Sequence, residues 1–205
     1  MKVRLANQHD CESLSDLILA SAPQSLTAIF DINSQFHCKG FLLSALANEN
    51  GQFGYANHWV IEQQGAVIGS VSAWYSELDK TFHQATLHSL MQYYGAEHVL
   101  EVLSRSQLVQ EFIPKPKAQQ WCIGHLAVAE SFQRQGAATV LLNVMSQAAK
   151  QHNKIELSLD VPIDNHSAIT FYQHHGFKIQ QQSILSQAML DAGFSSHLHM
   201  GKSLV

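Results

Sequence analysis

The pattern that most constrains the fold is an alternation of strand and helix signals in the C-terminal half of the chain. A strand pattern over residues 120–128 is followed by apolar residues at helix spacing over 136–150. Apolar and polar residues then alternate over 155–161, which is the period of a strand, and a second helix pattern runs over 165–175. This order predicts a mixed α/β sheet flanked by helices.

The other segments extend the same plan. Strands are predicted at 3–5, 178–185 and 197–204, and a hairpin at 58–75 with its turn at 63–66. Helices are predicted after Asp10, which can cap the first of them, over 24–50, and over 79–113 with an interruption at Gly95. A chain of 205 residues is long enough for one domain with a sizeable core, so we expect a single domain over 1–205.

Composition excludes several classes of protein. The net charge is −4 and there is no basic run, so nothing favours a nucleic-acid partner. No stretch of about 18 uncharged apolar residues predicts a membrane span, and the first residues lack the apolar segment of a signal peptide. The cysteines, Cys11, Cys38 and Cys122, form no CxxC pair, which favours reduced thiols and a cytoplasmic protein.

The turn between residues 128 and 136 is suited to bind an anion. A strand ends at Val128, and a helix opens around Gly136 with Ala137 and Ala138 behind it. The first N–H groups of a helix lack internal partners, the helix dipole favours negative charge there, and small residues let a phosphate approach the backbone. The same residues also suit a plain strand–turn–helix unit that packs closely, and the spacing fits neither GxGxxG nor GxxxxGK[ST].

This segment resembles a known family. Gln133-Arg-Gln-Gly136-Ala-Ala138 is similar to the Q/R-x-x-G-x-G/A signature of the GNAT superfamily of acetyl-CoA-dependent N-acyltransferases, and His125-Leu-Ala-Val128 resembles that family's fourth strand. The resemblance implies a mostly antiparallel sheet of about six to seven strands, splayed between the fourth and fifth. It also implies acetyl-CoA as the co-substrate, and no metal. The implied binding residues are Leu126, Ala127 and Val128 for the pantetheine arm, and Gln133, Arg134, Gln135, Gly136, Ala137, Ala138 and Thr139 for the pyrophosphate.

A second motif follows at the separation that the family has. The family pattern N-x-x-A-x-x-F/L-Y-x-x-x-G-F is matched by Asn165, Ala168, Phe171, Tyr172, Gly176 and Phe177. By resemblance, Asn165, Ala168 and Phe171 also contact the cofactor. From the residues alone, the segment also fits a capped amphipathic helix with a Phe–Tyr pair in the core.

The resemblance implies transfer of the acetyl group to a primary amine by direct attack on the thioester. A strand N–H near Val128 can stabilise the oxyanion, and Tyr172 is implied to give a proton to the departing sulfur. Tyr172 is therefore the one residue to which the resemblance assigns catalysis. On its residue type alone it could also be a core tyrosine with a satisfied hydroxyl.

The motifs name no base for the attacking amine. Cys122 and Gly124 occupy the fourth-strand positions where many relatives place an acid or a histidine. His125, Glu111 and Asp160 are candidates, as are a water chain or an amine already neutral in a dry pocket. Strand alternation places His125 on the face opposite Gly124, which disfavours it.

Metal binding is not indicated, although the chain has 13 histidines. His174 and His175 are adjacent, and His197 and His199 share a strand face, but no third ligand stands at a suitable spacing. We expect surface or stacking roles for them. Cys122 has no visible histidine–acid partner, so nothing favours it as a nucleophile.

Residues 79–117 exceed what the family needs between its third and fourth strands, and we expect a helical insert over the acceptor side. The aromatic residues in and just before this segment either line an acceptor pocket or, as we favour, form the insert's own core: Trp74, Tyr75, Phe82, Tyr93, Tyr94 and Phe112. A covering insert favours a small-molecule amine as the acceptor. An open groove would favour a protein or peptide, and a non-catalytic acyl-CoA-binding module is the third possibility. We expect no membrane partner, and either a monomer or a homodimer.

Overall fold

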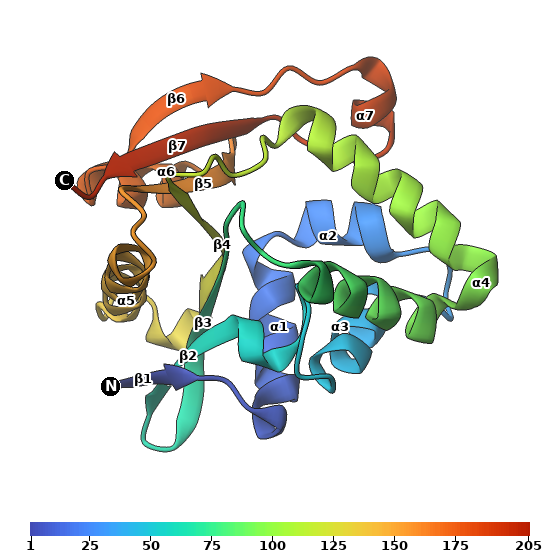
Figure 1. Ribbon diagram of the computed structural model, residues 1–205, viewed down its shortest axis with the longest axis horizontal. Helices are drawn as coiled ribbons and strands as arrows, with labels where there is room; N and C mark the ends of the chain where they lie inside the picture. The colour runs from blue at the N-terminus through green and yellow to red at the C-terminus, as the bar shows by residue number, and fades with distance from the viewer.

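A single mixed sheet organises the chain. In the computed structural model, which describes residues 1–205, seven strands lie in the order β1-β2-β3-β4-β5-β7-β6 (Figure 1). Only β4 and β5 are parallel neighbours, so the predicted mostly antiparallel sheet is confirmed. The strands are β1 (Lys2–Leu5), β2 (His58–Gln63), β3 (Ala66–Trp74), β4 (Gln120–Val128), β5 (Glu156–Pro162), β6 (Lys178–Gln182) and β7 (His197–Ser203).

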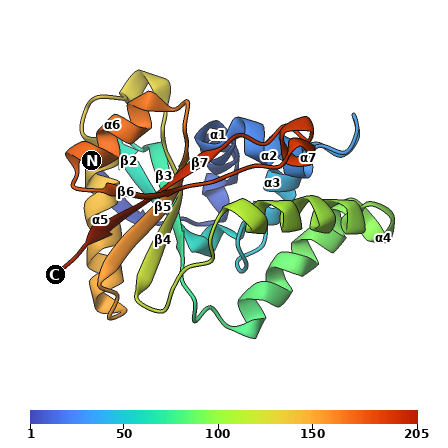
Figure 2. The ribbon, with the colours of Figure 1, turned by 90° about the horizontal axis from the view of Figure 1, so that it is seen from above.

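Helices cover both faces of this sheet. Figures 1 and 2 show α5 and α6 on one side and α1 to α4 on the other, with α7 near α2. No helix is both long and apolar enough to span a membrane. The helices are α1 (Cys11–Ser21), α2 (Pro23–Phe30), α3 (Cys38–Leu46), α4 (Lys80–Phe112), α5 (Ala137–Gln151), α6 (His166–His174) and α7 (Gln187–Asp191), with the short 3-10 helices η1 (Gln8–Asp10), η2 (Tyr55–Asn57) and η3 (Glu130–Phe132).

Each face of the sheet has its own core, and β5 shows why its sequence alternates. Leu157 and Leu159 are buried against Met145 of α5, in the core on the α5 side. Because successive side chains of a strand point to opposite faces, Ser158 and Asp160 point toward the side of α1 to α4. The strand predicted over 155–161 is thus confirmed with a polar face on the other side.

The segment predicted to be helical over 79–113 forms α4. A kink at Gly95, where φ is 65°, divides it into the two arms seen in Figure 2. The helix packs mainly on α2 and α3. Tyr94 stacks near Phe41, and Phe112 near Phe194, with ring centroids 5.5 Å apart in both pairs. These two aromatic residues of the insert therefore belong to the helical core.

Two predicted element boundaries are wrong, and local hydrogen bonds explain both. The helical region expected over 24–50 is two helices, because Asp31 accepts a hydrogen bond from the Cys38 N–H and fixes a loop between α2 and α3. The strand expected over 178–185 stops at Gln182, and α7, capped by the Ser186 hydroxyl, follows it.

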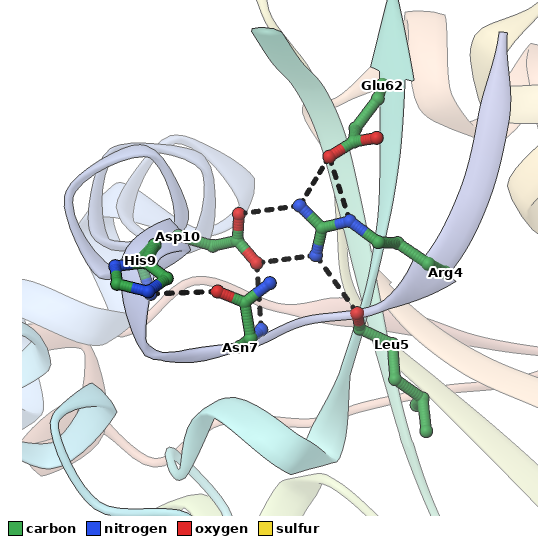
Figure 3. Close-up of polar contacts among 6 residues, drawn as sticks. All are labelled: Arg4, Leu5, Asn7, His9, Asp10 and Glu62. Atoms are coloured by element: carbon green, nitrogen blue, oxygen red, sulfur yellow. Dashed lines mark hydrogen bonds and ion pairs between the residues drawn. The ribbon is translucent and has the colours of Figure 1, made fainter. Parts of the chain in front are cut away.

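An ion-pair cluster fastens the edge of the sheet to the start of α1 (Figure 3). Arg4 of β1 donates to both carboxylate oxygens of Asp10, at 2.7 and 2.8 Å, and also to Glu62 of β2. Asp10 further accepts the Asn7 N–H at 2.8 Å. Asp10 precedes α1 as expected, but its carboxylate makes no capping bond to that helix. The predicted cap is therefore wrong, because Arg4 and Asn7 hold the carboxylate.

Replacing Arg4 with Met should destabilise the fold by about 3 kcal/mol near neutral pH, because it leaves the buried Asp10 carboxylate without its charge partner. The hydrogen bonds from Arg4 lower the pKa of Asp10 below its unfolded value. The stabilisation is therefore present above about pH 4 and is lost as the pH falls through the folded pKa. Urea unfolding of both proteins at several pH values measures the difference, which should shrink in acid.

The control for this prediction is Lys39→Met. Lys39 also pairs with two carboxylates, Asp16 and Glu12, but this cluster is exposed. Exposed pairs contribute little, so its loss should change the unfolding midpoint only slightly. Equal effects of the two substitutions, or an Arg4 effect that does not depend on pH, would contradict the role given to Asp10.

Candidate functional site

The sheet opens where β4 and β5 part. The two strands pair only at Gln120–Glu156, Trp121–Leu157 and Cys122–Ser158. Beyond the last pair, residues 123–128 and 159–162 have no strand partner on the sides that face each other. The splay implied by the resemblance is therefore present. Free backbone groups along such an opening can hydrogen-bond an extended ligand laid between the strands.

A β-bulge redirects the second half of β4. The register with β3 shifts where His125 and Leu126 stand, and His125 has a φ of 48°. The extra residue changes the alternation, so that Ile123, Leu126 and Val128 all pack in the core on the α5 side. His125 therefore lies on the same face as Gly124. The prediction that it lies on the opposite face is wrong, because it assumed an unbroken strand.

His125 ties the bulge to the first helix. Its Nδ1 lies 3.0 Å from the Ser21 hydroxyl of α1. Its ring packs beside Phe53 and Trp74, with centroids 5.8 and 6.0 Å away. Burial lowers the pKa of His125 to about 4, so the imidazole is neutral at neutral pH.

The loop between β4 and α5 presents a row of free amides. No backbone N–H from Arg134 to Thr139 donates a hydrogen bond within the chain, whereas the Gln133 N–H is bonded to Glu130 O. Gly136, at the N-cap of α5, has a φ of 87°, and a Cβ added there would meet no atom within 4 Å. Consecutive free amides at a helix N-terminus, next to open space, are suited to hydrogen-bond a phosphate group.

The glutamines of this loop hold its shape. The Gln133 side-chain amide donates to Val128 O at 3.1 Å, and the Gln135 side-chain amide donates to Ser131 O at 3.1 Å. Arg134 has a φ of 60°, the left-handed conformation, which turns the backbone before the helix begins. Gln133 thus contributes a side chain that shapes the loop, and the free amides begin one residue later.

The helix α6 brings the second motif to the same region. Ala168 and Phe171 pack against the core that also contains Leu126 and Val128 of β4. Asn165 caps α6 by accepting the Ala168 N–H at 3.1 Å. The cap leaves the side-chain NH₂ of Asn165 available to another partner. The structure therefore gathers the residues of both motifs around the open end of the splay.

Tyr172 lies in the buried face of α6. The residue is 8% exposed, and its ring packs edge-on against Phe171 and Phe177. Burial raises the pKa of Tyr172 to about 12, so the proton stays on the oxygen through the neutral range. The hydroxyl makes no hydrogen bond within the chain, and its oxygen is not completely buried. It is therefore available to a ligand as a proton donor.

A histidine links the two motifs. His175, at the end of α6, has its Nε2 3.0 Å from the Thr139 hydroxyl of α5 and its Nδ1 2.8 Å from Phe171 O. With both ring nitrogens in hydrogen bonds, His175 fixes the start of α5 relative to α6. This positioning role could not be found in the sequence, where His175 stood out only as the neighbour of His174.

The face of the sheet turned toward α1 to α4 is polar across β4, β5 and β7. Asp160 of β5 stands directly across from His199 of β7, and its Oδ1 lies 3.0 Å from the His199 Nδ1. Cys122 shares this face, and burial raises the pKa of its thiol to about 12, so the thiol stays protonated. Sequence reasoning had named Asp160 but not its partner. Only the spacing of His197 and His199 hinted that both point the same way.

The remaining expectations about reactive side chains can be compared with the structure. Cys11, Cys38 and Cys122 are free thiols. No group of three or more His, Cys, Asp or Glu side chains could hold a metal ion. His197 is bonded to the Ser195 carbonyl and packs on Phe112.

Comparisons with known proteins agree with this geometry. The sequence profile of the Acetyltransferase (GNAT) family matches residues 26–177. No curated protein sequence matches the chain. Among solved structures, an N-acetyltransferase from Staphylococcus aureus Mu50 has a TM-score of 0.72 at 16% identity, with 98% of this chain and 100% of that chain covered.

Two further structures have the same fold. YncA from Salmonella typhimurium, solved with its cofactor acetyl-CoA, has a TM-score of 0.56 at 16% identity, with 100% of this chain and 94% of that chain covered. A ribosomal-protein-alanine N-acetyltransferase from Brucella melitensis has a TM-score of 0.57 at 15% identity, with 99% of both chains covered.

The family profile spans most of the chain, and the sheet is splayed between β4 and β5. The implied co-substrate also fits these residues, because a row of unpartnered N–H groups suits its pyrophosphate. The chain belongs to the GNAT acetyltransferase family and is an acyltransferase that uses acetyl-CoA.

Proposed function

We propose that the protein transfers the acetyl group of acetyl-CoA to the primary amine of a small molecule by direct attack. The row of free N–H groups from Arg134 to Thr139 is the observation that supports the binding of acetyl-CoA. We assign them to the pyrophosphate, since charge-assisted hydrogen bonds to a phosphate are among the strongest available to a backbone. The unpaired edge of β4 at Leu126, Ala127 and Val128, with Asn165, Ala168 and Phe171 beside it, would hold the pantetheine arm.

Two groups of the chain would act on the reacting atoms. A free N–H of β4 near Val128 would donate to the carbonyl oxygen as it gains negative charge. The Tyr172 hydroxyl, protonated and unpartnered, would donate to the sulfur as the C–S bond breaks.

The helices that cover the polar face of β4, β5 and β7 favour a small molecule as the acceptor. Met189 of α7, Phe112 of α4 and Leu26 of α2 belong to one buried cluster on the acceptor side of the sheet. Phe112 also packs on His197 of β7, with ring centroids 5.7 Å apart. A site roofed by packed helices suits a small molecule, whereas an extended peptide needs an open groove.

A screen for release of the CoA thiol tests this proposal. Wild-type protein with acetyl-CoA should turn over at least one small primary amine, and mass spectrometry should find the N-acetyl product. A matched set of peptides with free N-termini should give at least about tenfold lower kcat/KM, a difference of about 1.4 kcal/mol in transition-state binding. Turnover of peptides alone would refute the small-molecule acceptor, and acetyl-CoA binding without any transfer would refute the enzyme activity proposed here.

A further inference from the structure

The acceptor face of β4 offers no base. Cys122 stays protonated, since burial raises the pKa of its thiol to about 12. Gly124 cannot be replaced by an acidic residue without rebuilding the site, because a Cβ there would stand 2.1 Å from the Trp74 ring. The bulge turns His125 to this face, but burial lowers the pKa of His125 to about 4 and its Nδ1 is held by Ser21. A neutral imidazole of that kind takes a proton from an ammonium group poorly.

The next two strands carry a carboxylate–imidazole pair on the same face. Asp160 and His199 are direct cross-strand partners, and their side chains are only 8% and 11% exposed. A carboxylate accepts hydrogen bonds and does not donate them, so its contact with Nδ1 requires the proton of a neutral ring to be on that nitrogen. The Nε2 lone pair is then free, and Nε2 makes no hydrogen bond within the chain.

The strand register places this pair at the opening of the sheet. The last pair between β4 and β5 is Cys122–Ser158, and Asp160 is the next residue of β5 on the same face. Asp160 is therefore the first residue on this face of β5 beyond the last pair with β4. The electrostatic effect of Asp160 on the thiol of Cys122 agrees with this closeness. A ligand that lies in the splay would pass beside the pair.

We propose that His199, oriented by Asp160, is the general base that takes a proton from the acceptor's ammonium group through its Nε2, directly or through one water. The assignment rests on the proposed acetyl transfer. The ammonium gives one proton to Nε2, and the neutral amine forms the C–N bond as the C–S bond breaks. Tyr172 gives its proton to the sulfur and regains one from the attacking nitrogen. His199 then releases its proton to solvent, so one proton leaves for each acetyl group transferred.

No other titratable group near the Asp160–His199 pair is as well placed to act as the base. Cys122 faces it from β4 and stays protonated. His197, on the same strand, is buried with a lowered pKa and has its Nδ1 on the Ser195 carbonyl. Asp164 follows the strand in the loop before α6 and is exposed. The residue of β6 beside His199 is Gln181, which carries no charge.

Kinetics of His199→Gln against pH test the role of the base. At neutral pH, kcat should fall at least tenfold with a small primary amine, while acetyl-CoA affinity stays unchanged. The deficit should shrink as the pH rises toward the pKa of the amine, about 10, because the acceptor then loses its proton without help. His88→Gln, an exposed substitution on α4, is the control and should behave as the wild type. A constant deficit at all pH values, or none, would overturn the proposal.

Asp160→Asn separates positioning from catalysis. Loss of the carboxylate should lower kcat, since nothing then holds the ring with its Nε2 toward the acceptor, while acetyl-CoA affinity should stay unchanged. Nitrogen NMR of the ring provides a readout that needs no acceptor. Wild-type His199 should carry its proton on Nδ1 and lose that preference in the variant. A wild-type ring with its proton on Nε2 would overturn the role of His199 as the base, whatever the acceptor screen finds. Failure of this proposal can therefore be distinguished from failure of the proposed acetyl transfer.

Discussion

Gly136→Glu should weaken acetyl-CoA binding by about 100-fold or more, which corresponds to about 2.7 kcal/mol. Gly136 stands within the row of free amides, and the space beyond its Cα is open. A glutamate side chain would enter that space and bring a negative charge to the position that we assign to the pyrophosphate. It would also mask the N–H groups that a phosphate needs. Calorimetric titration of both proteins with acetyl-CoA measures the loss.

The matched control is Gly65→Glu. Gly65, in the turn between β2 and β3, has a φ of 82° against 87° at Gly136, and neither position has an atom within 4 Å of an added Cβ. The two substitutions therefore add the same charge and a similar backbone strain. Gly65→Glu should lower stability by a similar amount and leave acetyl-CoA affinity intact. If Gly136→Glu and the wild type bound acetyl-CoA with equal affinity, the row of free amides would not be part of the binding site.

The parts of the site that the sequence predicts are those with local signals. The start of α5 after Gly136, the Asn165 cap, and the end of α6 just before Gly176 all depend on residues within one turn of each other. The alternation in β5 was readable because one face of the strand is apolar and the other is not. These signals located the motif residues, and the fold places them around the open end of the splay.

The parts that the sequence does not predict depend on contacts between distant strands. The bulge at His125 could not be foreseen, because a non-glycine residue at positive φ has no signature in a single sequence. The pairing of Asp160 with His199 depends on the register between β5 and β7, which the intervening α6, β6 and α7 determine. The link from His175 to Thr139 likewise joins two helices that meet only after the sheet forms.

Tyr172→Phe should lower kcat by about 100-fold or more, the usual scale for loss of a general acid. The substitution keeps the ring and its packing on Phe171 and Phe177, and it removes only the hydroxyl. Since a donor that acts as the C–S bond breaks contributes little to ground-state binding, acetyl-CoA affinity should change little. Because the pKa of Tyr172 is about 12, its ionisation should not limit the wild-type rate below about pH 11.

Tyr94→Phe is the control that separates chemistry from packing. Tyr94 is also buried, but its hydroxyl donates to the Phe30 carbonyl at 2.7 Å in the helical core, away from the splay. Its loss leaves a buried carbonyl unpaired, so this variant should lose about 1–3 kcal/mol of stability and keep the wild-type kcat. Tyr172→Phe should show the reverse, because its hydroxyl has no partner in the chain. Wild-type turnover in Tyr172→Phe, when chemistry limits the rate, would make Tyr172 a packing residue and leave the departing sulfur to another donor.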